Sequence, residues 1–155
     1  MLKYVDAKVV FAEVPDEVTL AINISGCPCN CKGCHSSYLA EDIGTELTFN
    51  EVRKLIKKNS GISCIALMGG DAEPDKVNTL ASFIINHYNS IKVAWYSGRQ
   101  ELSKEIDLQN FDFIKLGSYK EEFGPLNSRT TNQRFYKVNG KELIDITNLF
   151  WKSSD

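Results

Sequence analysis

Residues 62–71 read ISCIALMGGD, an almost unbroken apolar run that ends in two glycines and an aspartate. A short apolar run without polar alternation is typical of a strand that is buried on both faces inside a parallel sheet. Gly69 and Gly70 end the run, because glycine adopts turn conformations that other residues avoid. The stretch therefore predicts a buried strand over residues 62–68 of an α/β protein.

The segments on both sides of this strand alternate between strand and helix patterns. Thr48 and Glu51 form a capping-box pattern at the start of a helix. Pro74 suits the first turn of the next helix. The further expected strands cover residues 7–14, 18–24, 91–96 and 111–116. Two helices are expected to start at residues 47 and 74, and a third is expected to cover residues 100–106. A hairpin near Asn139-Gly140 and a short terminal helix that carries residues 149–151 complete the set.

Repeated strand–helix–strand units predict right-handed crossovers and a parallel sheet. In such a sheet the loops after the carboxyl ends of the strands meet at one edge, and ligands bind there. The segments that fall at this edge are the cysteine-rich stretch after residue 24, Gly69-Gly70-Asp71, Ser97-Gly98 and residues 115–117. We therefore expect these four segments to form one site.

Composition places the chain among ordinary globular proteins. It has 155 residues, of which 43% are hydrophobic and 25% are charged, so a single domain over residues 1–155 is expected. The formal net charge of -2 argues against nucleic acid as the main partner. No apolar run reaches the roughly 18 residues of a membrane span, and the N-terminus lacks the pattern of a secretory signal. These features predict a cytoplasmic protein without a membrane segment.

The cysteines are unusually crowded. Four of the five, Cys27, Cys29, Cys31 and Cys34, lie within eight residues, whereas Cys64 stands apart in the apolar run. The odd number and the crowding favour metal or redox chemistry over a disulfide framework. All four clustered thiolates could close a tetrahedral zinc site. Alternatively, Cys27, Cys31 and Cys34 could hold three irons of a 4Fe-4S cluster and leave the fourth iron open to a ligand.

The cysteine spacing and the Gly-Gly-Asp turn together resemble the radical S-adenosylmethionine (SAM) superfamily. The spacing C-x3-C-x2-C directly follows a predicted strand, and Gly69-Gly70-Asp71 ends the next parallel strand. Within this superfamily the chain is similar to the activating proteins of anaerobic ribonucleoside-triphosphate reductase. The matching stretches are GC at 26–27, GCH at 33–35, MGGD at 68–71, WYSG at 95–98 and PLNSRTTNQR at 125–134, so that the likeness spans about residues 18–136.

The resemblance implies a fold, two cofactors and a set of binding residues. The implied fold is an α/β protein, a truncated and laterally open (β/α) barrel of mostly parallel strands of the radical SAM type. Cys27, Cys31 and Cys34 would ligate a 4Fe-4S cluster, and SAM would chelate the open iron. The residues implied as SAM contacts are Gly33, Cys34, His35, Gly69, Gly70, Asp71 and Ser97. Gly69 and Gly70 would allow a close approach to the methionine end, and Asp71 would accept a hydrogen bond from its ammonium group.

The implied reaction is radical chemistry on a protein substrate. One electron from the cluster would break the bond between the sulfonium and the adenosyl carbon, which gives methionine and a 5'-deoxyadenosyl radical. This radical would take a hydrogen atom from a glycine of the large subunit of anaerobic ribonucleoside-triphosphate reductase. A small reductant protein such as a flavodoxin or ferredoxin would supply the electron. No residue of the chain is required as a general acid or base.

Two other functions fit parts of the sequence. A four-cysteine zinc module would bind a partner without catalysis, and a radical SAM enzyme could act on a different peptide or small molecule. Cys29 breaks the cluster spacing and is expected to be a bystander, whereas Cys64 is expected in the core. Lys115 could be an edge lysine or a contact of cofactor or partner, and residues 127–134 could cap turns or contribute to function.

Overall fold

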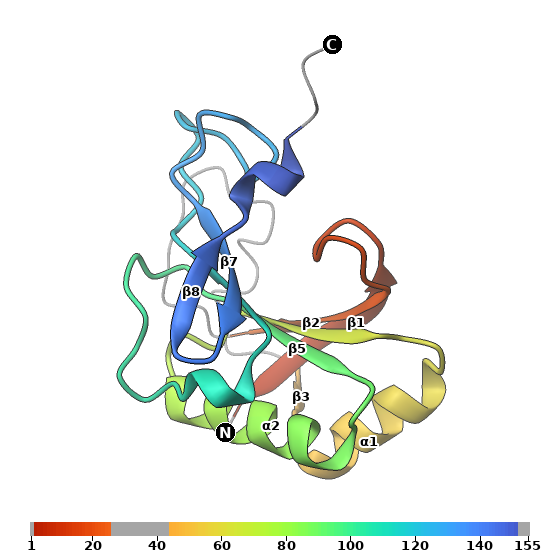
Figure 1. Cartoon of the computed structure of the whole chain (residues 1–155). Coiled ribbons are helices and arrows are strands. Elements are labelled where there is room, and N and C mark those ends of the chain that lie inside the picture. Colours follow the sequence, from red (N-terminus) through yellow and green to blue (C-terminus); the bar gives the residue numbers. More distant parts are fainter. Residues whose placement is uncertain (1, 26–43, 152–155) are drawn as a thin grey trace.

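The computed structural model describes residues 2–25 and 44–151 of the chain. The elements are β1 (Lys3–Val10), β2 (Thr19–Ile24), β3 (Thr45–Glu46), α1 (Phe49–Lys58), β4 (Cys64–Met68), α2 (Pro74–His87), β5 (Lys92–Tyr96), η2 (Leu108–Asn110), β6 (Phe113–Leu116), β7 (Arg134–Asn139), β8 (Glu142–Asp145) and η3 (Thr147–Phe150). The strands form one eight-stranded sheet in the order β3-β1-β2-β4-β5-β6-β7-β8. Helices α1 and α2 lie side by side below this sheet in Figure 1.

Strands β2, β4, β5 and β6 form the parallel centre of the sheet. Their registers pair Asn23 with Met68, Met68 with Tyr96 and Tyr96 with Lys115, so the carboxyl ends of all four strands fall at one edge. The first four residues of β4 are buried. The buried parallel strand predicted from the apolar run is therefore confirmed.

Helix α1 begins where the capping pattern places it. Thr48 accepts a hydrogen bond from the Glu51 N–H at 3.1 Å. The Glu51 carboxylate accepts the Tyr4 hydroxyl at 2.7 Å, which ties the helix to β1. Burial, together with this hydrogen bond and the charge of Glu51, raises the pKa of Tyr4 to about 12. The tyrosine is thus a neutral donor throughout the physiological range.

The sheet separates two apolar cores of unequal size. The larger core lies between the sheet and the helices, and its fully buried members include Leu20, Ile22, Ile65, Leu67, Val77, Ile84 and Val93. The smaller core lies on the opposite face and consists of Val14, Cys64, Ala66, Ala94, Phe113 and Phe135. Cys64 is fully buried, as expected, and burial is the main cause that raises the pKa of its thiol to about 12.

The expected truncated, laterally open (β/α) barrel of mostly parallel strands is wrong. Among the described residues, three strand pairings are parallel and four are antiparallel, which makes an open, mixed sheet. The antiparallel pairs involve the outer strands β1, β3, β7 and β8. Strands β1 and β2, and also β7 and β8, follow each other through connections too short for a crossover, and such pairs run antiparallel. Both described α-helices lie on one face, so they do not surround the sheet.

Two local expectations also differ from the structure. The first strand covers Lys3–Val10 rather than residues 7–14, because Val14 turns into the smaller core from the loop that follows. Residues 100–106 form bends and a turn instead of a helix. This stretch is held by Leu102 and Ile106, which pack against the larger core. The hairpin near Asn139-Gly140 is confirmed, since β7 and β8 pair on both sides of that turn.

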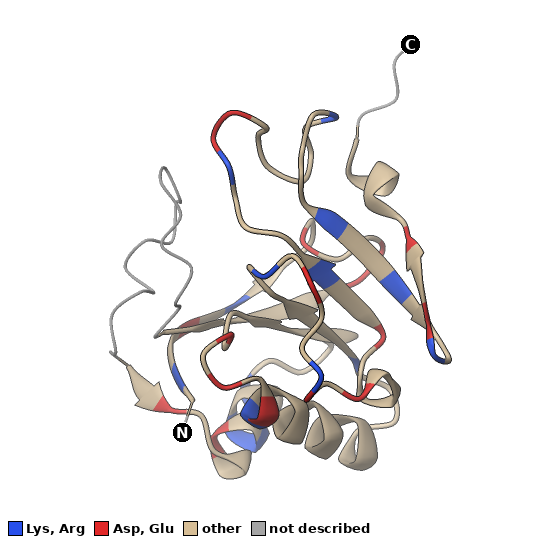
Figure 2. Ribbon diagram, turned by 90° about the vertical axis from the view of Figure 1, so that its left-hand side faces the viewer, with Lys and Arg blue, Asp and Glu red and all other residues tan. Residues whose placement is uncertain are grey.

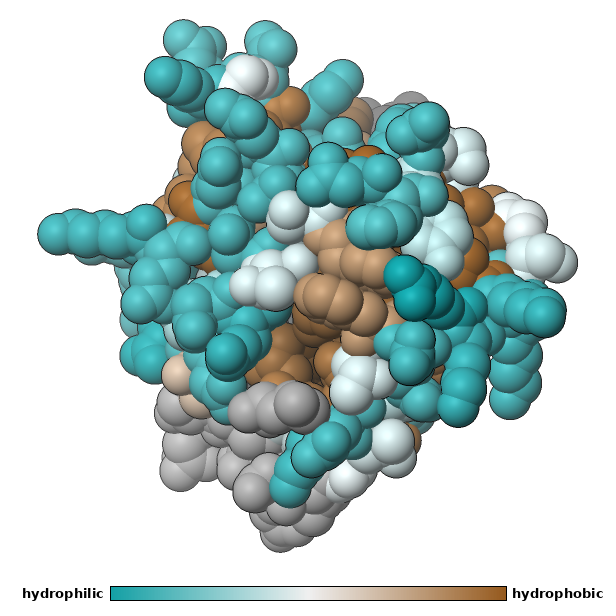
Figure 3. Space-filling view, turned by 90° about the horizontal axis from the view of Figure 1, so that it is seen from below, coloured by the Kyte–Doolittle hydropathy of each residue, from teal (hydrophilic) through white to brown (hydrophobic). Residues whose placement is uncertain are grey.

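The helix side of the molecule carries a small apolar hollow. A cavity of about 250 Å³ there is lined mainly by Leu2, Leu47, Phe49 and Leu80. Figure 3 shows apolar residues in a hollow among polar ones on this side. Within residues 2–25 and 44–151, no helix combines the length and the apolar character needed to cross a membrane.

Ile65→Ala should lower the free energy of unfolding by about 2–5 kcal/mol, because it opens a cavity in the larger core at a fully buried residue of β4. Urea-induced unfolding of the purified chain measures this loss. Leu149→Ala is the control, because the Leu149 side chain is 57% exposed, and it should change stability by less than about 0.5 kcal/mol. Similar losses in the two variants would contradict this assignment of the core.

Candidate functional site

The carboxyl edge of the parallel strands carries the predicted site residues that the structure describes. Gly69, Gly70 and Asp71 follow β4, and Ser97 follows β5. Ser25 follows β2 and is the last described residue before the cysteine-rich segment. The expected cluster ligands Cys27, Cys31 and Cys34, and the expected SAM contacts Gly33 and His35, lie outside the described residues.

Both ends of the cysteine-rich segment are attached beside the start of β1. The Ser25 N–H donates a hydrogen bond to the Lys3 carbonyl at 2.9 Å. Gly44, where the described chain resumes, has φ 106° and packs so tightly against the Tyr4 carbonyl that a Cβ there would overlap it. Four thiols lie between these two attachment points, and thiolates are the usual ligands of iron–sulfur clusters. The donor set and its attachment at the carboxyl edge fit such a cluster.

The two glycines after β4 are required by backbone conformation and by packing. Gly69 and Gly70 have φ 109° and 88°, a region that favours glycine. A Cβ on Gly70 would lie 2.5 Å from Val77 Cγ2 of α2. The Gly69 carbonyl accepts the Trp95 indole N–H at 2.7 Å. Close packing of the turn against α2 therefore explains why Gly70 has no side chain, independently of any cofactor.

Asp71 and Ser97 are brought together, although 26 residues separate them. The Ser97 hydroxyl donates to Asp71 Oδ1 at 2.5 Å, and the Gly98 N–H donates to Oδ2 at 2.9 Å. Only 6% of Asp71 and 1% of Ser97 are exposed. Buried carboxylates need such donors, because charge is costly to remove from water. The two residues form a preorganised acidic group at the edge of the sheet.

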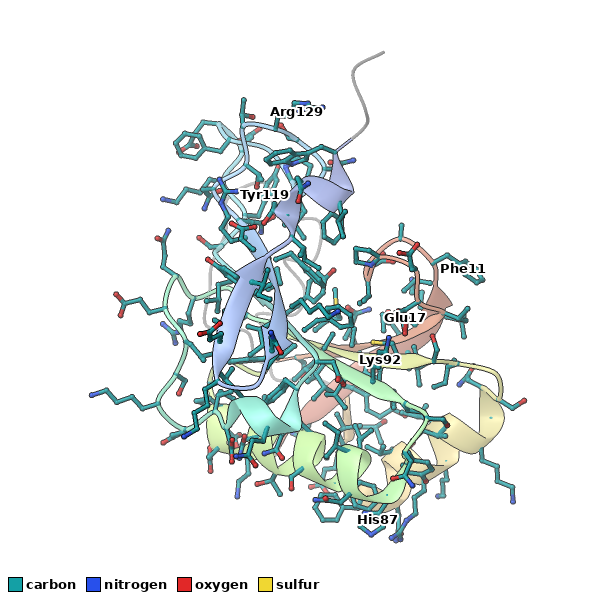
Figure 4. All side chains as sticks on the ribbon, viewed as in Figure 1. Phe11, Glu17, His87, Lys92, Tyr119 and Arg129 are labelled. Atoms are coloured by element: carbon teal, nitrogen blue, oxygen red, sulfur yellow. The ribbon has the colours of Figure 1, made fainter. Side chains whose placement is uncertain are left out.

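A cavity of about 900 Å³ opens on the face opposite the helices. Its floor is the cross-strand row of Met68, Tyr96 and Lys115. The loop between β1 and β2 contributes one wall, and the C-terminal part of the chain contributes the other. Figure 4 labels Phe11 on the first side and Arg129 on the second. The remaining lining residues are Ala12, Glu13, Pro15, Asp16, Pro125, Leu126, Asn127, Gln133, Leu149 and Phe150.

Tyr96 attaches the floor of the cavity to its first wall. The Tyr96 hydroxyl donates a hydrogen bond to the Glu13 carbonyl. Burial, followed by the nearby charge of Glu13, raises the pKa of Tyr96 well above its usual range, so the phenol keeps its proton at neutral pH. This bond and the burial of Val14 in the smaller core hold the loop in place.

Sequence reasoning did not identify Met68, Tyr96 or Gln133 as cavity residues. The alternation of side chains along each strand is the signal that could have found the first two. Cys64, Ala66 and Met68 alternate with Ile65 and Leu67, which face the helices, and Tyr96 alternates with Trp95 in the same way. Gln133 lies just before β7, and only the pairing of β7 with β6 brings it to the cavity.

Lys115 is a cavity residue and not an edge lysine, because β6 lies between β5 and β7. Its ammonium donates to the Gly117 carbonyl at 2.6 Å and to the Ser97 carbonyl at 3.3 Å. The stretch 127–134 has mixed roles. Asn127 and Gln133 line the cavity, whereas the Arg129 guanidinium lies 5.6 Å from the centre of the Trp151 ring.

Charges of both signs are interspersed over the described part of the chain, as Figure 2 shows. A surface ion pair joins Glu17 and Lys92 at 3.3 Å. In residues 2–25 and 44–151, no group of three or more histidine, cysteine, aspartate or glutamate side chains is placed to hold a metal ion. The metal ligands expected from the sequence, Cys27, Cys31 and Cys34, lie outside these residues.

Comparison with known families identifies a family for most of the chain. A family model described as a 4Fe-4S single cluster domain matches residues 17–135, which is well over half of the chain. The matched region includes the cysteine-rich segment, the Asp71–Ser97 pair and the floor of the cavity. No curated protein and no solved structure matches the chain.

Gly70→Ala should destabilise the chain more than Gly61→Ala. Both glycines have positive φ, 88° and 92°, so backbone strain is common to the two substitutions. Only at position 70 would the new Cβ meet a neighbour, Val77 Cγ2, and overpacking of this kind costs about 1–3 kcal/mol more. Thermal unfolding of the two variants measures the difference. Equal losses would show that packing is not the reason for the glycine at position 70.

Proposed function

Because this chain belongs to the family of 4Fe-4S single cluster domains, we propose that it is a radical SAM activase. It cleaves SAM reductively at its 4Fe-4S cluster and generates a glycyl radical on the large subunit of an anaerobic ribonucleoside-triphosphate reductase. A flavodoxin or ferredoxin supplies the electron, and the reaction takes place in the cytoplasm.

One observation carries the proposal. The cysteine-bearing segment follows Ser25 in the sequence, and Ser25 directly follows β2 at the same edge of the sheet as the buried Asp71–Ser97 pair. Met68, Tyr96 and Lys115, at the carboxyl ends of the next three strands, form the floor of the large cavity. The proposed SAM contact and the floor of the proposed substrate cavity therefore belong to one edge of the sheet, and the proposed cluster ligands follow this edge in the sequence. Ligand sites of parallel sheets form at this edge.

Cys27, Cys31 and Cys34 are the proposed ligands of the cluster, and Cys29 is left out because it breaks their spacing. When bound, such a cluster offers an open iron to SAM and supplies the electron that breaks the bond from its sulfur to the adenosyl carbon. Gly33 and His35 flank Cys34 and are the proposed contacts of the adenine side.

The proposed role of the chain's own residues is to hold SAM in place. A carboxylate can accept about four hydrogen bonds. The structure gives Asp71 two donors, the Ser97 hydroxyl and the Gly98 N–H. The remaining lone pairs are proposed to accept the ammonium group of SAM. Burial favours this contact, because a charge-assisted hydrogen bond is stronger away from water.

The proposed substrate is a glycine-bearing segment of a folded protein. The walls of the cavity carry apolar side chains such as Phe11 and Phe150, and its floor is partly polar. This combination suits a polypeptide, which has apolar side chains to bury and backbone groups that need hydrogen bonds. The hydrogen atom moves from the glycine Cα to the adenosyl carbon, which gives 5'-deoxyadenosine. No proton is transferred in this step, so the chain needs no general acid or base.

Each of the single substitutions Cys27→Ala, Cys31→Ala and Cys34→Ala should prevent cluster binding and abolish SAM cleavage, because each deletes one of three iron ligands. Iron and sulfide analysis after anaerobic purification, with the absorption spectrum, measures the loss. Cys29→Ala and Cys64→Ala are the matched controls and should keep the iron content nearly intact. A colourless, zinc-loaded protein in which Cys29→Ala is as damaging as the other three would overturn the cluster assignment.

A glycyl radical should form when the cluster-loaded chain, dithionite and SAM are mixed anaerobically with the large reductase subunit. Electron paramagnetic resonance detects this radical directly. The Asp71→Asn variant should give less of it, because the variant weakens the proposed contact with the SAM ammonium group. Cleavage of SAM without a radical on that subunit would retain the radical SAM activity and exclude the proposed substrate.

A further inference from the structure

Lys115 lies on an interior strand of the sheet and places a buried positive charge at the floor of the cavity. The residue is only 8% exposed, and its ammonium donates to the carbonyls of Ser97 and Gly117. The Gln133 side chain joins the same group. With its amide oxygen facing inward, it accepts from Lys115 Nζ at 3.0 Å and from the Tyr119 N–H at 3.2 Å.

Ser97 connects this buried positive charge to a buried negative one. The Ser97 carbonyl accepts from Lys115, and its hydroxyl donates to Asp71. The Ser97 hydroxyl also accepts the Arg99 N–H at 3.1 Å. One residue therefore carries the hydrogen bonds that run from β6 through the end of β5 to the turn after β4. Because buried charges must be hydrogen-bonded to remain stable, the position of each member depends on the others.

We infer that Lys115 is a positioning residue that holds Ser97, and through Ser97 the Asp71 carboxylate, at the carboxyl edge of the sheet. Its long side chain starts on β6 opposite Tyr96 and reaches the first residue after β5. Nothing in its own strand requires a charge, since the neighbouring Ile114 and Leu116 are core residues. The inference rests on the proposed function in one respect, namely that Asp71 is the residue that binds SAM.

The same side chain belongs to two parts of the site. Lys115 lines the cavity and also holds the loop that orients Asp71. The floor of the proposed substrate cavity and the proposed SAM contact therefore share one hydrogen-bond network. Loss of the ammonium should loosen Asp71 without removing any atom of Asp71 or of Ser97.

The first test is amide hydrogen exchange at Gly98, whose N–H is donated to Asp71 Oδ2. In Lys115→Met this exchange should accelerate about tenfold or more relative to amides of α2, because the carboxylate is no longer held, and Lys115→Arg should restore much of the protection. Lys137→Met makes the same change on an exposed lysine of β7 and should leave Gly98 unchanged. Phe113→Leu lowers packing on β6 itself and controls for a general loss of stability.

The second test is calorimetric binding of SAM to the cluster-loaded chain. Lys115→Met and Ser97→Ala should each weaken SAM binding about tenfold. The double variant should bind SAM as tightly as the single variant with the lower affinity, because both changes act through Asp71. If the wild-type chain does not bind SAM, the proposed function fails, and exchange at Gly98 still decides whether Lys115 positions the carboxylate.

Two results would overturn the inference. The first is a Gly98 exchange rate in Lys115→Met that equals the rate in Phe113→Leu. The second is a loss of SAM affinity in the double variant that equals the product of the two single-variant losses. Should Lys115→Met not fold, the carbonyl carbon resonance of Ser97 in Lys115→Arg decides the same point. The ammonium donates to the Ser97 carbonyl, so this resonance must shift when the donor changes, and an unchanged signal overturns the inference.

Discussion

The burial of β4 on both faces is the constraint on which the rest of the molecule depends. A strand in this position must pair its backbone groups with neighbours on both sides, and β2 and β5 provide them in parallel register. Ile65 and Leu67 face the helices, while Cys64 and Ala66 face the other way. This arrangement brings the end of β2, the turn at Gly69 and the loop at Ser97 to one edge, where the proposed chemistry takes place.

The two faces of the central strands differ in side-chain size, and the face opposite the helices carries both the smaller core and the cavity. Large aliphatic side chains and Trp95 face the helices and fill the larger core. On the opposite face Ala21, Ala66 and Ala94 are cross-strand neighbours, and Phe113 follows them on β6. Val14 and Phe135 pack with Ala66 and Ala94 in the smaller core, and no described α-helix covers this face of the sheet. The cavity lies along the carboxyl ends of the same strands.

Elements with strong local signals were predictable from the sequence, whereas the sheet as a whole was not. The apolar run before Gly69, the cap at Thr48 and the proline at the start of α2 each depend on residues within one or two turns of chain. The hairpin near Asn139-Gly140 was also expected, because its turn residues are local. The open, mixed sheet was not expected, because the resemblance implied a barrel of mostly parallel strands and the closure of a sheet depends on contacts between distant strands. Residues 100–106 were expected to be helical, but the packing of Leu102 and Ile106 against the core is satisfied without a helix.

The buried central strand, the starts of the two described α-helices and the C-x3-C-x2-C spacing that indicates an iron–sulfur cluster can be recognised in the sequence, because each of these features involves residues close together in the chain. Only the tertiary structure decided that Gly70 must lack a side chain because Val77 lies against it. It also decided that Asp71, Ser97 and Lys115 share one hydrogen-bond network. These residues belong to three successive strand ends, and the register of a parallel sheet, a property of the whole fold, brings them within hydrogen-bonding distance.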